Sequence, residues 1–145
     1  ASYGVGINEI HDGHLIVSDT ANNRICKVTL PDYQVTVVAG SAAVPGSTDG
    51  AAKDSTFTYP GFLAIDRDGN IIVAEYGMHR IRIIAGHGGP PSEGRVTTIG
   101  GLQGYADGPE HAAQFNVPND VAVLSDGSLV IADAKQSHPA GQARR

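Results

Sequence analysis

The sequence repeats itself with a long period, and this repeat limits the chain to a small set of folds. Four landmarks of one segment return 58 residues later with unchanged spacing: Asp49, Phe57, Pro60 and Glu75 correspond to Asp107, Phe115, Pro118 and Asp133. Upstream, residues 12–19 match residues 68–75 at a spacing of 56. A fixed period of this order is typical of repeat proteins, in which each unit packs on its neighbours.

Each unit contains short apolar runs separated by turn residues, which predicts β-strands. The Asp-Gly pair at 68–69 lies between two such runs, and Asp-Gly is a strong signal for a tight hairpin. No stretch of 11 or more residues has a helical period, and only 50–57 and 108–115 are expected to form a helical turn. The expected strands are 5–10, 14–18, 24–28 and 34–38 in the first unit, and 61–66, 70–74, 80–84 and 95–99 in the second.

Four antiparallel strands per repeated unit describe one blade of a β-propeller. We therefore expect an all-β chain, a propeller fragment of about two and a half four-stranded blades. The expected divisions are blade 1 at 1–40, an inter-blade loop at 41–60, blade 2 at 61–101, a second loop at 102–118, and an incomplete blade 3 with a polar end at 119–145. Propellers usually have 4 to 8 blades, so we expect further blades from a longer chain or from a second copy.

Composition removes several classes of protein. The chain has 15 acidic and 10 basic side chains, which argues against nucleic-acid binding by charge alone. Its apolar runs are far shorter than the roughly 20 residues of a membrane span, and no signal segment is recognisable, so a soluble protein of unknown compartment is expected. Cys26 is the only cysteine, which rules out an internal disulfide.

The residue pattern of the repeat resembles that of one propeller family. Residues 68–75, followed by Gly77, Met78, His79, Arg80 and Ile81, are similar to the NHL repeat, as are residues 18–25. The connections 39–57 and 100–115 resemble the long Asp-Gly … Ala-x-Phe loops between blades of one NHL subgroup. The resemblance implies a propeller fold over nearly the whole chain. It also implies a non-catalytic scaffold that presents a loop-rich rim to a protein partner.

The predicted binding residues lie on the rim that carries the long loops, because in an up-and-down blade the connection between strands two and three shares a side with the link to the next blade. Long loops on a rigid scaffold are the usual place for binding. The candidates are Asn22, Asn23, Tyr76, Met78, His79, Gln103 and Tyr105.

A second set of residues recurs between blades and is interpreted as structural. Asp19, Glu75 and Asp133 hold one equivalent position, and Arg24 and Arg80 follow two of them by five residues. The acids therefore predict repeated ion pairs, with a carboxylate ring around a channel as the alternative. Phe57 and Phe115 are expected to anchor the long loops by packing.

No catalytic residue, metal site or cofactor is predicted, because no nucleophile elbow, phosphate loop or ligand spacing is present. Two other functions stay open. A metal-assisted lyase or lactonase would require His and Asp on the inner strands, which instead carry Ala64, Ile65, Ala122 and Val123. RNA binding would require a basic, aromatic rim, whereas the loops are mainly acidic.

Overall fold

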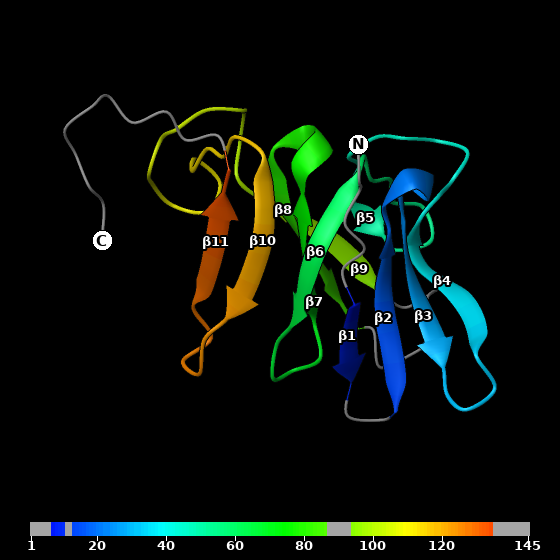
Figure 1. The fold of residues 1–145 in the computed structure, drawn as a ribbon. Coiled ribbons are helices and arrows are strands. Elements are labelled where there is room, and N and C mark those ends of the chain that lie inside the picture. Colours follow the sequence, from blue (N-terminus) through cyan, green and yellow to red (C-terminus); the bar gives the residue numbers. More distant parts are fainter. Residues whose placement is uncertain (1–6, 11–12, 87–93, 135–145) are drawn as a thin grey trace.

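The computed structural model describes residues 7–10, 13–86 and 94–134, and the side chains from residue 13 onward within these ranges. Three antiparallel sheets stand side by side, each contacting the next through its inner strands (Figure 1). This arrangement confirms the predicted all-β class and the partial propeller. The polar segment 135–145 and the expected start of the first strand at residues 5 and 6 lie outside the described residues.

The first sheet is a complete four-stranded blade. Its strands follow one another in the order of the sequence: β1 Ile7–Ile10, β2 His14–Asp19, β3 Arg24–Thr29 and β4 Gln34–Gly40. A 3-10 turn, η1 Thr20–Asn22, joins β2 to β3. These bounds agree with the expected strands to within two residues wherever the chain is described.

The second sheet has a strand more than predicted. It contains β6 Pro60–Ile65, β7 Ile71–Glu75, β8 Arg80–Ala85 and β9 Arg95–Ile99, with the 3-10 turn η2 Tyr76–Met78 between β7 and β8. A short strand within the presumed loop, β5 Gly50–Ala51, pairs with the outer edge of β9. The connection 41–60 therefore runs down the outside of blade 2 before it returns to β6, and only part of it lies on the rim.

The third sheet consists of two strands among the described residues, β10 Pro118–Val123 and β11 Leu129–Asp133. The tight turns of the three blades are equivalent, with Gly13, Gly69 and Gly127 all at positive φ. Glycine adopts this conformation without the steric cost that a side chain would add. The Asp-Gly signal in the sequence therefore located the hairpins of all three blades.

Two apolar layers hold the blades together. One fills the space between blades 1 and 2 and contains Ile16, Ile25, Phe57, Ile71 and Val73, all fully buried. The other lies between blades 2 and 3, where Ile72, Ala74, Ile81 and Val121 are buried and Ile83, Ile99 and Leu129 are only partly covered. Alternate residues of β7 thus face opposite neighbours, which explains why this strand is apolar from Ile71 to Ala74.

Candidate functional site

The rim at the top of Figure 1 gathers η1, η2 and the ends of both long connections. The residues at the ends of the two 3-10 turns, Asn23 and His79, adopt left-handed backbone conformations with φ of 53° and 58°. The side chains of both residues accept hydrogen bonds from the backbone of the next connection. Each one forms the centre of a junction between two blades.

At the first junction, the side chain of Asn23 holds the end of the first connection. Its Oδ1 accepts a hydrogen bond of 2.9 Å from the backbone N–H of Tyr59. The Tyr59 ring stacks on Tyr76, with ring centroids 5.7 Å apart and planes inclined by 14°. Beside them, the amide of Asn22 donates to Asp19 at 2.9 Å. The predicted residues Asn22, Asn23 and Tyr76 are therefore brought to one place by blades 1 and 2.

At the second junction, the imidazole of His79 has the role of the Asn23 amide. Its Nδ1 accepts a 3.0 Å hydrogen bond from the backbone N–H of Val117. The adjacent Asn116 links two further predicted residues: its Oδ1 accepts from Gln103 at 2.9 Å, and its amide donates to the Tyr105 hydroxyl at 2.7 Å. His79, Gln103 and Tyr105 thus form a second group at the boundary of blades 2 and 3.

Several apolar side chains on this rim remain exposed despite these bonds. Met78 is 36% exposed, Tyr59 39%, Tyr105 46% and Leu102 74%. Val44, in the first connection, is 55% exposed. Large apolar residues on ordered loops are what a binding surface requires, whereas an isolated exposed residue would mean little.

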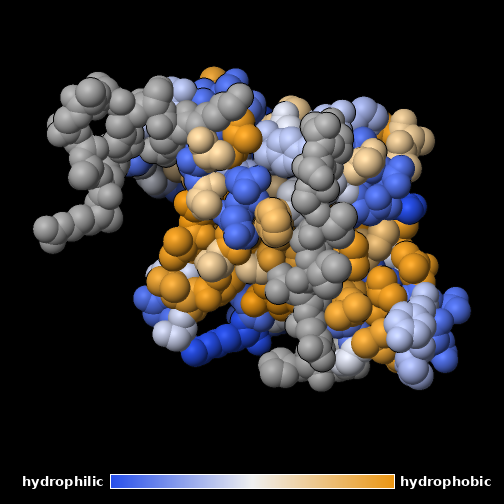
Figure 2. Space-filling view, in the orientation of Figure 1, coloured by the Kyte–Doolittle hydropathy of each residue, from blue (hydrophilic) through white to orange (hydrophobic). Residues whose placement is uncertain are grey.

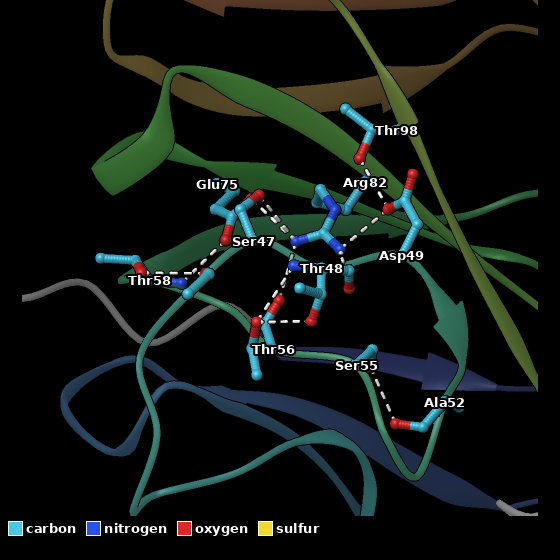
Figure 3. Close-up of polar contacts among 11 residues, drawn as sticks. Ser47, Thr48, Asp49, Ala52, Ser55, Thr56, Thr58, Glu75, Arg82 and Thr98 are labelled. Atoms are coloured by element: carbon cyan, nitrogen blue, oxygen red, sulfur yellow. Dashed lines mark hydrogen bonds and ion pairs between the residues drawn. The ribbon is translucent and has the colours of Figure 1, made fainter.

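Beneath the rim, a buried polar network fixes the first connection to blade 2 (Figure 3). The guanidinium of Arg82 donates to Glu75 at 3.0 Å and to the backbone oxygens of Thr56 and Thr48 at 2.9 and 2.8 Å. Both charged side chains are 0% exposed. The Arg82 carbon Cζ also lies 4.6 Å from the centre of the buried Phe57 ring, within cation–π distance.

The carboxylate of Glu75 closes the same network. It accepts from the backbone N–H of Thr58 at 2.7 Å and from the hydroxyl of Ser47 at 2.8 Å. Burial raises the pKa of Glu75, and this effect exceeds the opposing effects of Arg82 and the hydrogen bonds. Asp133 accepts the backbone N–H of Asn116 in the equivalent way, at 2.9 Å. The recurrent acid therefore holds the connection that leads into its own blade.

The expected ion pairs are present in blade 1 and altered in blade 2. Arg24 lies 2.7 Å from Asp19, and this hydrogen bond raises the pKa of the arginine. The arginine bound by Glu75 is Arg82, not the expected Arg80. The sequence pattern did not distinguish the two, because they lie two residues apart on the same face of β8 and the register places Arg80, not Arg82, directly opposite Glu75. Phe115 packs against the apolar layer between blades 2 and 3.

Among the described residues, no group of three or more His, Cys, Asp or Glu side chains is arranged to hold a metal ion. In the same part of the chain, none of the helices is long and apolar enough to cross a membrane. The residues that sequence reasoning missed are Tyr59, Arg82 and Ser47. Tyr59 carried a usable signal, since it lies at the end of a long connection and its counterpart in the next repeat is Val117, so that it breaks the repeat.

Comparison with known proteins agrees with this geometry. The family model described as "NHL repeat" matches residues 57–84, which cover β6, β7 and most of β8. The chain contains an NHL repeat. The protein SUPPRESSOR OF QUENCHING 1, chloroplastic, of Arabidopsis thaliana is 29% identical over 99 residues, which are 68% of this chain and 9% of that protein.

Solved structures share the NHL-type propeller architecture. A protein of unknown function from Bacteroides thetaiotaomicron is 27% identical, with a TM-score of 0.74 over 85% of this chain and 30% of that one. An auxiliary nutrient binding protein from Bacteroides ovatus has a TM-score of 0.74 at 19% identity, over 90% of this chain and 35% of its own. The chain thus spans about a third or less of the proteins that it resembles. The NHL-repeat propeller fold supports a protein-binding scaffold in general terms, without indicating a specific partner.

Proposed function

We propose that the chain is a non-catalytic scaffold whose loop-rich rim binds a protein partner. The observation that carries this proposal is the exposure of Tyr59, Met78 and Tyr105 on connections that hydrogen bonds hold in place. Rigid aromatic anchors lose little conformational entropy on binding, and such residues contribute most of the affinity of protein interfaces. The partner surface would be apolar at its centre.

The electrostatic character of the rim adds a condition on the partner. Asp107 and Glu110 are exposed on the second connection. An acidic surround favours a partner with basic side chains around an apolar centre, because complementary charge speeds association and excludes acidic partners. The same surround disfavours RNA, whose phosphates require clustered cations.

Two of the solved neighbours are described as auxiliary nutrient binding proteins, which is consistent with a binding role. Their identity of 19% carries the fold alone, so the ligand class is argued from the rim instead. A lyase or lactonase activity receives no support from a specific observation, and we do not propose it.

The test has two steps. A photoreactive amino acid at position 78 should crosslink to one predominant protein in a lysate of the source organism, whereas the same amino acid at Val35, on the distant β4, should not. The purified partner should then bind wild-type chain saturably, and Tyr59→Ala should weaken the affinity at least tenfold. Equal affinity for the wild type, Tyr59→Ala and the control Val35→Ala would overturn the proposal.

A further inference from the structure

Arg80 is a cation at the rim whose side chain the fold leaves unpaired. It is the first residue of β8, directly after η2, and it is only partly buried. Among residues 13–86 and 94–134, its side chain makes neither an ion pair nor a hydrogen bond, and its Nε is buried without a partner. A shielded polar atom without a partner costs free energy, so its presence in a folded protein requires an explanation.

Comparison with blade 1 shows how Arg80 comes to be unpaired. The equivalent arginine, Arg24, lies 2.7 Å from Asp19, the acid opposite it in the register. Arg80 also has an acid opposite it, but Arg82 binds that carboxylate from two residues farther along β8. Blade 1 has Cys26 in place of Arg82, so its first arginine keeps the acid. The additional arginine of blade 2 therefore leaves the recurrent one available to another anion.

The position of Arg80 suits a contact with a docked protein. Met78, two residues earlier in η2, is 36% exposed. Figure 2 shows hydrophilic and apolar residues side by side over the upper part of this face, whereas the larger apolar areas lie lower on the blades. When a partner covers such a mixed surface, water is excluded around the guanidinium, and an ion pair formed there is stronger than one in open solvent.

We propose that Arg80 binds a carboxylate of the protein that docks on the rim, supplied by an Asp or Glu next to an apolar residue that packs on Met78. This inference rests on the function proposed above and specifies one contact of its partner. The planar guanidinium can donate two parallel hydrogen bonds to the two oxygens of a carboxylate. The acidic side chains on the second connection oppose a doubly charged phosphate more strongly than a singly charged carboxylate.

The charges on the rim then determine the direction in which the partner lies. Arg80 faces blade 1, because it shares its face of β8 with Ile84, which packs in the apolar layer between blades 1 and 2. Asp107 and Glu110 are exposed on the connection that leads into blade 3. A partner with an acid toward blade 1 and basic residues toward blade 3 fits in one orientation, since reversal places like charges opposite each other.

The test uses a phage-displayed library of random peptides, selected on the wild-type chain. Peptides that bind the wild type and lose affinity for Tyr59→Ala are ligands of the rim, and an Asp or Glu beside an apolar residue should recur among them. In fluorescence anisotropy with the tightest of these peptides, Arg80→Met should weaken binding at least tenfold. The control Arg95→Met removes an exposed arginine of β9 and should bind like the wild type.

A change on the peptide side leaves the protein unaltered and isolates the contact. Replacing the peptide acid by its amide should weaken binding to the wild type as much as Arg80→Met does, and it should have little further effect on that variant. Arg80→Met should also unfold at the same urea concentration as the wild type, because methionine keeps the apolar stem and no hydrogen bond to the described residues is lost.

The outcomes separate this inference from the proposed function. If peptides depend on Tyr59 but bind Arg80→Met normally, or tolerate loss of their acid, the rim binds a partner and the carboxylate contact is wrong. If the selection yields no peptide that depends on Tyr59, the proposed function and this inference both fail.

Discussion

Replacing Arg82 by methionine is the sharpest test of how the long connection is held. The guanidinium makes five hydrogen bonds, to Glu75, Ser47 and Asp49 and to the backbone oxygens of residues 48 and 56. Methionine has a similar length and can keep the contact with the Phe57 ring, but it donates none of these bonds. The variant therefore leaves the Glu75 carboxylate buried without its cation.

The expected cost follows from that geometry. Removing one member of a buried ion pair costs about 3–5 kcal/mol, because the remaining charge stays desolvated. Glu75 retains the N–H of Thr58 and the hydroxyl of Ser47, which places the expected loss toward the lower end of this range. A domain of ordinary stability, about 5–15 kcal/mol, still folds after such a loss.

Urea unfolding followed by far-UV circular dichroism measures this loss. Arg95→Met is the matched control, since Arg95 is exposed on β9 and its replacement should change stability by less than about 0.5 kcal/mol. In a double-mutant cycle, Glu75→Gln combined with Arg82→Met should cost at least about 1 kcal/mol less than the sum of the single changes. If Arg82→Met behaves like the control, the network does not anchor the connection and our reasoning is wrong.

Four further predictions concern single side chains. Burial raises the pKa of Glu75, so the folded state binds a proton at this carboxyl group more tightly than the unfolded chain does. The free energy of unfolding of the wild type, relative to that of Glu75→Gln, should therefore increase as the pH falls from about 7 through the pKa of Glu75 in the folded state. Parallel pH profiles of the two proteins would contradict this prediction. Ser18→Ala should stabilise by about 1 kcal/mol, since the buried Ser18 hydroxyl has no hydrogen-bond partner among the described residues. Ser55→Ala should destabilise, because its hydroxyl donates to a backbone oxygen at 2.8 Å. Thermal unfolding that moves both variants in one direction would refute the pair. His79→Asn should preserve stability, whereas His79→Ala should lose about 1–2 kcal/mol in urea unfolding. Alanine lacks the hydrogen-bond acceptor for the N–H of Val117 and is strained in the left-handed conformation. Equal losses in the two variants would show that this acceptor is unimportant. Burial raises the pKa of the Cys26 thiol, so a thiol reagent at about pH 8 should label it only after unfolding, and rapid labelling of the native chain would disprove its burial.

Most of the fold could be predicted from the repeat, because each blade carries the same local signals for turns and strands. The hairpin at 68–69 and the apolar run of β7 identify the first two strands of a blade without reference to distant residues. Register follows from the Asp-Gly turn, since its geometry fixes which residues face each other. The family resemblance agrees with the match of the NHL model to residues 57–84.

The strand β5 and the Arg82 network could not be predicted in the same way. Gly50 and Ala51 have low strand propensity, and they pair with β9 only because Ala52, Phe57 and Arg82 hold the connection against blade 2. Such contacts join residues 25 or more positions apart and occur once among the described residues. A periodic pattern carries no information about them.

The candidate site contains both recurrent residues, which the repeat predicts, and residues that occur in one repeat only. Asn23 and His79 recur at one position and were predicted to bind a partner, yet in the structure both side chains hold the backbone of the following connection. Asparagine and histidine can replace each other here because each offers an acceptor and each tolerates the left-handed conformation. Because recurrent residues hold the junctions, the other residues at the junctions can differ between repeats. Tyr59 and Val117 occupy equivalent positions, and only Tyr59 provides an aromatic ring on the rim. In a repeat protein of this kind, binding specificity therefore depends on the residues that differ between repeats. The residues that recur hold the connections on which the differing residues lie.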